Sequence, residues 1–147
     1  QYLKKGISKS MDKITEKALQ LHNQGNNCCQ SVCLAFADKL GIDEEVLFKI
    51  SEGFGAGMGN LQGSCGALSA AVMIAGIYNS GGKDAAVRTK SKTYKLVSQI
   101  NNEFIDLVGS MYCKEIKGLE TGHVLKSCDG CIETAVYIVN KFIFKEN

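Results

Sequence analysis

The feature that most constrains the fold of this chain is a nearly continuous helical spacing of apolar residues, interrupted by glycine and never by proline. None of the 147 residues is proline, and no stretch alternates between apolar and polar residues as a half-buried strand would. Glycine occurs 16 times and often follows an apolar stretch, where it commonly terminates a helix. The pattern predicts an all-α fold, a single-domain helical bundle of about five to seven helices.

Capping residues and glycines divide the chain into predicted helices. A first helix is expected from Ser10 to near Gly25, after an N-terminal extension formed by residues 1–9. The others are a helix capped by Asn26 or Asn27 and ended by Gly41, a short one capped by Asp43, an apolar one from about Ser64 to Asn79, a long one from Asp84 to Val108, a short turn around Cys113, and a last one from about Ser127 to Phe144. The long helix is expected to bury Val87, Tyr94, Val97, Ile100, Phe104, Leu107 and Val108.

The charge balance argues against several classes of partner. Seventeen basic residues stand against 15 acidic ones, a net charge of +2, which is too balanced to indicate binding to nucleic acid or to an anionic membrane. Arg88 is the only arginine, so bidentate phosphate contacts are nearly absent. The longest apolar run, residues 66–78, is too short to span a bilayer. No secretory signal is visible, and we expect a cytoplasmic protein that binds neither nucleic acid nor membranes.

The last predicted helix is apolar over an unusually wide arc. Packing in the core of the chain itself explains such an arc, and a homodimer interface is the alternative. The apolar residues are Ile132, Val136, Ile138, Val139, Phe142, Ile143 and Phe144.

Cysteine is the strongest compositional signal. The chain has seven cysteines, an odd number, and it is long enough to build a core without disulfides. We therefore expect reduced thiols that take part in metal or redox chemistry. Cys29 and Cys33 lie four residues apart on one helix face and are expected to be buried as small apolar side chains.

Four cysteines, namely Cys28, Cys65, Cys113 and Cys128, are each predicted at the start of a different helix. Free backbone N–H groups and the helix dipole stabilise negative charge there and lower the pKa of a thiol. Four thiolates facing one point would repel one another unless a cation lay between them, and soft sulfur ligands suit a metal or an iron–sulfur centre. The spacing matches no zinc-ribbon or ferredoxin pattern, so convergence is an expectation from helix starts alone.

Cys128 and Cys131 also form a C-x-x-C motif at a helix start, the arrangement used by dithiol oxidoreductases. No βαβ pattern surrounds the motif, which argues against a thioredoxin relative, and Ile132 stands where a haem-attachment motif requires histidine. His22 and His123 are more typical of surface or loop positions than of metal ligands.

Residues 52–71, EGFGAGMGNLQGSCGALSAA, are unlike any other part of the chain. They are not a dinucleotide-binding fingerprint, because Met58 and Asn60 stand where G-x-G-x-x-G needs glycine, and no G-K-[ST] follows to make a P-loop. We interpret the stretch as a mount that holds Cys65 ahead of a slim apolar helix. A plain flexible loop is the alternative.

These residues together resemble the C_GCAxxG_C_C family of putative redox-active proteins, which is named for four cysteines and a central C-G-A-x-x-G motif. The resemblance runs from about Gly25 to Val139, with Ala70 in place of the last glycine of the motif. It implies redox activity, and a similarity to the cysteine-bearing part of split-Soret cytochromes implies an iron–sulfur centre. The haem-binding half of those cytochromes finds no support here. The matching residues are Asn27-Cys28, Cys65-Gly66-Ala67, Met111-Tyr112-Cys113 and Cys128.

Three functions remain open. The leading hypothesis is a small redox protein that binds an iron–sulfur cluster, expected as [2Fe–2S], through the four helix-start cysteines and exchanges single electrons with an unidentified redox partner. The second is a metal-free thiol–disulfide oxidoreductase in which Cys128 attacks and Cys131 or Cys65 resolves the mixed disulfide. The third is a structural or sensing zinc module on the same four thiols.

Overall fold

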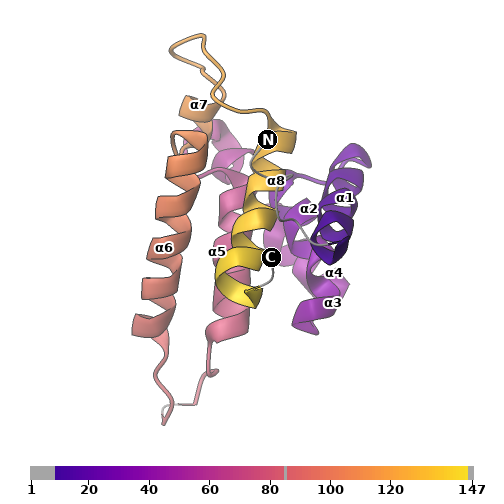
Figure 1. Ribbon diagram of the computed structural model, residues 1–147, viewed down its shortest axis with the longest axis vertical. Coiled ribbons are helices and arrows are strands. Elements are labelled where there is room, and N and C mark those ends of the chain that lie inside the picture. The colour runs from indigo at the N-terminus through magenta and orange to yellow at the C-terminus, as the bar shows by residue number, and fades with distance from the viewer. Residues whose placement is uncertain (1–8, 85, 146–147) are drawn as a thin grey trace.

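The computed structural model describes residues 9–84 and 86–145, and these form an all-α bundle (Figure 1). The all-α prediction is confirmed, since no β-strand occurs in the part of the chain that the structure describes. The helices are α1 (Lys9–Asn23), α2 (Cys28–Ala35), α3 (Ala37–Leu40), α4 (Glu44–Glu52), α5 (Gly66–Asn79), α6 (Lys90–Val108), α7 (Cys113–Ile116) and α8 (Cys128–Val139), with π-helical turns η2 (Gly57–Leu61) and η3 (Asn140–Phe144).

The predicted N-terminal extension, residues 1–9, lies outside the described residues except for Lys9, which already belongs to α1. The predicted helix that ends at Gly41 is present as two segments, because the backbone leaves the helical conformation at Phe36, between α2 and α3. Gly41 ends α3 in the left-handed conformation, with φ at 64°, as expected for a C-terminal glycine.

Local caps explain the starts of the two helices that matter most for the site. Asn27 caps α2 through a reciprocal pair of hydrogen bonds: its Oδ1 accepts from Gln30 N (2.9 Å), and Gln30 Oε1 accepts from Asn27 N (3.0 Å). Ser127 caps α8, where its Oγ accepts from Gly130 N at 3.0 Å. The sequence left Asn26 and Asn27 open as the cap of the second helix, and the structure has Asn27. The predicted start of the last helix at about Ser127 is confirmed.

Two expectations about the long helix are wrong. Its N-cap is Thr89 and not Asp84, whose carboxylate instead accepts from a backbone N–H two residues further on. The reason is tertiary, because Thr89 Oγ1 accepts from Gly81 N at 3.1 Å and ties the start of α6 to the loop after α5. Val87 therefore precedes the helix and is 44% exposed, while Tyr94 points outward and is 67% exposed.

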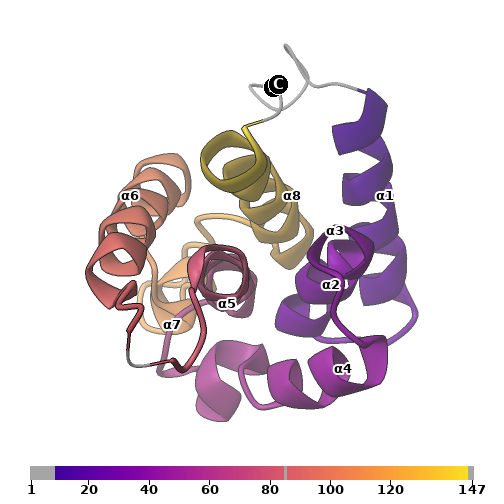
Figure 2. The same ribbon diagram turned by 90° about the horizontal axis from the view of Figure 1, so that it is seen from below.

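The core lies around α5, which packs against α2, α6 and α8 (Figure 2). The α5 side chains that face these neighbours include Ala67, Ala70 and Ala71, each with no exposed surface. Small side chains let neighbouring helices approach closely, and Ala70 preserves this at the position where the family motif has glycine. None of the helices in the described part of the chain is long and apolar enough to cross a membrane.

The wide apolar arc of the last helix packs into the core of this chain. Its residues Ile132, Val136, Ile138, Val139 and Ile143 are buried. Phe142 and Phe144 are partly buried against the same core. Phe144 stacks on Phe36 with ring centroids 5.7 Å apart. The arc is therefore explained without a second copy of the chain, and the homodimer stays a prediction.

Candidate functional site

The first residues of several helices meet around one pocket of about 220 Å³. Cys28, Cys113 and Cys128 are the first residues of α2, α7 and α8, and Cys65 is the N-cap of α5, so the predicted helix-start positions are confirmed. All four cysteines line the pocket, and Cys131 lines it as well. In Figure 1, α5 and α8 both start at the end of the bundle where α7 lies.

Backbone pairing holds Cys65 beside Cys113. The N–H of Cys65 donates to Met111 O at 2.8 Å, and the N–H of Cys113 donates to Gly63 O at 2.9 Å. The backbone of Gly57 passes close to Cys113 in the left-handed conformation, with φ at +54°. A Cβ at Gly57 would lie only 2.4 Å from the Cβ of Cys113. Glycine is needed there both for the conformation and for the close approach. The glycine-rich stretch is thus a mount for Cys113 as well as for Cys65.

The thiols of the pocket shift one another's pKa in two pairs. Cys28 and Cys128 form one pair, and Cys65 and Cys131 form the other. Cys113 is a neighbour of Cys65 and Cys128; burial and then the Cys65 charge raise its pKa. For each of the C-x-x-C cysteines, Cys128 and Cys131, the largest effect on the pKa comes from a thiol outside the motif.

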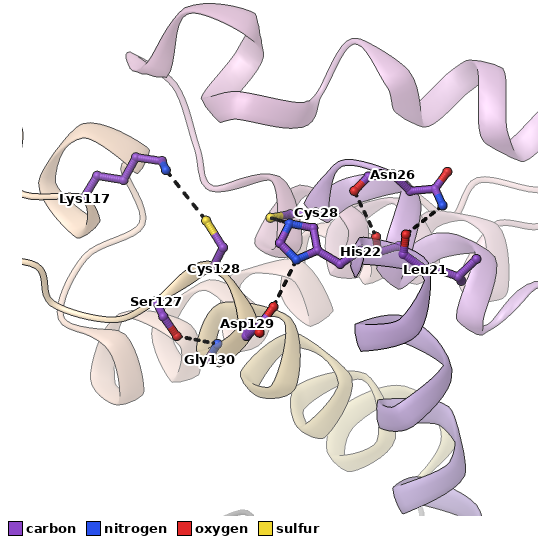
Figure 3. A network of polar contacts seen from close by, with 10 residues as sticks. Leu21, His22, Asn26, Cys28, Lys117, Ser127, Cys128, Asp129 and Gly130 are labelled. Carbon is purple, nitrogen blue, oxygen red and sulfur yellow. Dashed lines mark hydrogen bonds and ion pairs between the residues drawn. The ribbon is translucent and has the colours of Figure 1, made fainter. Parts of the chain in front are cut away.

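Cys128 lies beside the ammonium group of Lys117 (Figure 3). The hydrogen bond from Cys28 is the main cause that lowers the pKa of Cys128 to about 5, and the charges of Lys117 and His22 add to it against the opposing effect of burial. Lys117 Nζ lies 3.7 Å from Cys128 Sγ. A thiol beside a cation at a helix start is the arrangement expected of a reactive or metal-binding cysteine.

Cys65 is the second acidic thiol. The hydrogen bond from Cys131 is the main cause that lowers its pKa to about 7; burial opposes the shift, and the backbone N–H groups of Leu68 and Ala67 in the first turn of α5 add to it. The two donors behave in the opposite way, because the hydrogen bond to the partner sulfur and then burial raise the pKa of Cys28 and of Cys131. In each pair, therefore, one pKa is lowered and the other is raised.

His22 lies at the rim of the pocket, which the sequence did not indicate. Its Nδ1 is 3.0 Å from Asp129 Oδ1 and its Nε2 is 3.9 Å from Cys28 Sγ, so it connects the end of α1 to the start of α8 (Figure 3). Asp129 is 107 residues away in sequence, and no local pattern links the two. His123, the other histidine considered as a ligand, does not line the pocket.

The charged side chains that line the pocket are basic. Lys117 and Lys126 line it, His22 joins them when protonated, and no carboxylate is among the lining residues. The N-terminal ends of α5 and α8 add the positive ends of their helix dipoles. This electrostatic environment favours a negatively charged occupant.

The side chains of the pocket do not surround a single point. Across residues 9–84 and 86–145, no three His, Cys, Asp or Glu side chains are arranged so that they could hold a metal ion. A pocket of about 220 Å³ is also far larger than the roughly 15 Å³ that one water molecule occupies, so it has room for a group of several atoms. Soft sulfur donors are the ligand type that iron–sulfur clusters take, and thiols also exchange with disulfides, so the chemistry of the lining is compatible with more than one use.

The remaining two cysteines are part of the core. Cys29 and Cys33 have no exposed surface, and Cys29 Sγ lies 3.6 Å from the sulfur of Met73. A hydrogen bond with Cys33 and then burial raise the pKa of Cys29. The prediction that these two behave as buried apolar side chains is confirmed.

Comparison with known proteins identifies one family. Residues 26–142 match the family model described as "Putative redox-active protein (C_GCAxxG_C_C)". No curated protein and no solved structure gives a significant match to the chain. The matched range contains all five cysteines of the pocket but not His22.

Proposed function

The chain belongs to the C_GCAxxG_C_C family of putative redox-active proteins, and from this premise we propose that it is an electron carrier that binds an iron–sulfur cluster, expected as [2Fe–2S], in its cysteine pocket. The observation that carries the proposal is the presence of five thiols around one pocket whose charged lining is basic. The family resemblance assigns the ligand role to Cys28, Cys65, Cys113 and Cys128. When bound, the cluster would accept and release single electrons.

The four proposed ligands differ in whether they must lose a proton before they can bind iron. Cys128 and Cys65, with pKa values lowered to about 5 and about 7, supply thiolates near neutral pH. Cys28 and Cys113, whose pKa values are raised, must each release a proton before they can ligate. In the tautomer whose Nδ1–H donates to Asp129, His22 presents Nε2 as a proton acceptor 3.9 Å from the Cys28 sulfur.

Positive charge in the pocket wall offsets the negative charge of four thiolates. Lys117 lies within 3.7 Å of Cys128 Sγ, and Lys126 lines the same wall. The backbone N–H groups that point at Cys65 add fixed dipoles that need no reorganisation. Such groups stabilise the more negative, reduced state of an iron–sulfur centre and so raise its potential.

Reconstitution under anaerobic conditions tests the proposal. The full chain, incubated with iron and sulfide and then desalted, should absorb between about 400 and 600 nm and contain about two iron and two sulfide per chain. Cys65→Ser should lose most of both, because it removes a ligand. Cys33→Ala is the matched control and should keep them, because Cys33 lies in the core. A colourless wild-type protein without iron or sulfide after reconstitution would rule the proposal out.

A second candidate, thiol–disulfide exchange in the metal-free protein, is favoured by one observation. The pKa of Cys128 is lowered to about 5, and Cys28, which lines the same pocket, has the largest effect on it. We therefore take Cys28, in place of Cys131 or Cys65, as the resolving residue. Digestion of oxidised, metal-free protein should then give a peptide linked through Cys28 and Cys128. Stoichiometric zinc without any redox response would instead support the zinc module.

A further inference from the structure

A second hollow lies at the end of the bundle away from the cysteine pocket. It is an open groove of about 600 Å³ between the last turn of α5, the first half of α6 and η3. In Figure 1, α5 ends and α6 begins at the end of the bundle opposite α7. The volume lies within the range of about 300–1,000 Å³ that is typical of small-molecule sites. No cysteine lines this groove, so the proposed electron transfer leaves it unexplained.

Aromatic rings form the apolar part of the groove. Tyr78, Phe142 and Phe144 line it, and Tyr78 is 56% exposed. Phe144 is fixed by two ring contacts, since it stacks on Phe36 with centroids 5.7 Å apart and meets the ring of Tyr78 edge-on at 5.3 Å. These rings offer both edges and faces to an aromatic ligand.

Lysines form the charged part of the groove. Lys92, Lys95 and Lys145 line it, and no carboxylate of the described residues does. Lys92 and Lys95 lie three residues apart on one face of α6, and Lys145 ends η3 in the left-handed conformation, with φ at 56°. Across residues 9–84 and 86–145, no carboxylate forms an ion pair with any of the three. Ammonium groups of this kind attract an anion, and lysine binds phosphate as a point charge.

Contacts within the chain hold the walls of the groove in place. Asn79 Nδ2 donates to Thr93 Oγ1 at 2.9 Å, which ties the end of α5 to the start of α6. On the opposite wall, Lys141 Nζ lies 5.1 Å from the ring centroid of Phe142 and 2.7 Å from Glu103 Oε2, which ties η3 to α6. Because the groove is formed without a ligand, binding does not require these elements to be ordered first.

We propose that this groove binds a small aromatic molecule that carries a phosphate or another anionic group. The aromatic part packs against the three rings, and the anionic group is held by the three lysines. A neutral apolar ligand would make no use of the ammonium groups, and a simple anion would make no use of the rings. The site lies apart from the cysteine pocket, and the inference does not depend on a cluster there.

Three related probes separate the two halves of the site. 1-Naphthyl phosphate has an aromatic ring system and a phosphate, 1-naphthol has the ring system alone, and inorganic phosphate has the anion alone. Each is titrated into the full chain, reduced and metal-free, and binding is followed by calorimetry and by changes in backbone amide NMR shifts. 1-Naphthyl phosphate should bind about tenfold more tightly than either of the others, because only this probe uses both the rings and the lysines. The shifts should cluster in the last turn of α5, the first half of α6 and η3.

Substitutions test the two kinds of contact one at a time. Lys92→Gln combined with Lys95→Gln should weaken binding of 1-naphthyl phosphate by about 3- to 10-fold and leave binding of 1-naphthol unchanged, because only charge is removed. Tyr78→Leu should weaken binding of both probes, because it removes an aromatic contact. Lys13→Gln combined with Lys49→Gln is the matched control and should bind like wild type. It removes the same charge from exposed positions outside the groove.

Several results would overturn the inference. Equal affinity for 1-naphthyl phosphate and inorganic phosphate would show that the rings take no part, and equal effects of the two double variants would show that the lysines of the groove take none. Loss of binding in Lys117→Gln, with retention in the variant that lacks Lys92 and Lys95, would place the anion in the cysteine pocket. Binding of an acidic peptide, without binding of 1-naphthyl phosphate, would assign this surface to an acidic protein partner. None of these results concerns iron uptake, so failure here is distinct from failure of the proposed function.

Discussion

Cys28 and Cys29 are neighbours in sequence, yet they belong to two different regions of the molecule. Cys28 begins α2 at the pocket, where its Sγ lies 3.9 Å from His22 Nε2 and where Cys128 also lines the wall. Cys29 has no exposed surface and lies in the core, 3.6 Å from the sulfur of Met73. One step along a helix turns a side chain by about 100°, which is enough to separate the two regions. The chemistry of a thiol here depends on the helix face and not on the residue type.

Charge distinguishes the two regions as well. Both contain thiols that affect each other's pKa, Cys28 with Cys128 in the pocket and Cys29 with Cys33 in the core. In the pocket, Lys117 Nζ lies 3.7 Å from Cys128 Sγ, and the pKa of Cys128 is lowered. In the core, the pKa of Cys29 is raised. A helix start and a positive charge beside Cys128 favour its thiolate.

Replacing the two neighbours one at a time should give the largest contrast. Cys28→Ala should lose nearly all bound iron and sulfide after anaerobic reconstitution, because it removes a proposed ligand. Cys29→Ala should keep them and should lose about 1 kcal/mol of unfolding free energy, from the small cavity left in the core. Iron analysis and urea unfolding measure the two effects. Equal iron content in the two variants would contradict the division of α2 into a pocket face and a core face.

Alkylation of the reduced, metal-free protein should also distinguish Cys128 from Cys29, by the pH dependence of the reaction. We expect a smaller effect than the loss of iron. Only the thiolate reacts, so the rate at Cys128 should rise with pH around its pKa of about 5 and level off above it. Cys29 should stay unmodified throughout, because it is fully buried. Peptide mass spectrometry with iodoacetamide resolves the individual cysteines.

Replacing Lys117 tests whether its positive charge lowers the pKa of Cys128. Lys117→Met should move the Cys128 profile to higher pH, because the positive charge 3.7 Å from the sulfur stabilises the thiolate. Lys114→Met is the matched control, since Lys114 Nζ lies 3.4 Å from Glu120 and does not line the pocket. A Cys128 profile centred near the ordinary thiol value of 9.0 in the wild type would show that the pocket does not activate this cysteine.

The smallest expected effects concern the N-caps of α2 and α8, the helices that begin with Cys28 and Cys128. Asn27→Ala should cost about 1–2 kcal/mol, because Asn27 both caps α2 and donates to Glu52 O at 2.9 Å. Ser127→Ala removes a single cap contact and should cost about 1 kcal/mol. Thermal unfolding should show decreases in Tm of about 2–4 °C per kcal/mol. A larger loss of stability in Ser127→Ala than in Asn27→Ala would mean that the hydrogen bond from Asn27 to Glu52 O contributes nothing to stability.

The helix starts of the site could be predicted because their causes are local. Asn27 and Ser127 each bond a backbone N–H three residues on, and such a contact is visible in the sequence as a residue type at a fixed spacing. The same rule failed at Asp84, because the bond between Thr89 and Gly81 crosses a loop and decides where α6 begins. Local rules succeed where the partner is near in sequence.

The contacts within the pocket could not be predicted in this way, because the partners are far apart in the sequence. Cys65 and Cys131 line the same pocket, and the partner of His22 is Asp129; both pairs join segments far apart in the chain. No spacing in the sequence indicates either of them. The sequence-based view of Cys131 as the partner of Cys128 arose from their nearness in the chain, whereas the largest effect on the pKa of each comes from a thiol of another helix.

The sequence by itself determined the helical class, most of the helix boundaries and the presence of a cysteine at four helix starts, because periodicity, capping and glycine act over a few residues. Only the tertiary structure decided that these starts meet in one pocket, which thiols pair, and that Lys117 and His22 stand beside them. These depend on how α2, α5, α7 and α8 pack, since a charge or a hydrogen bond acts through space and not along the chain.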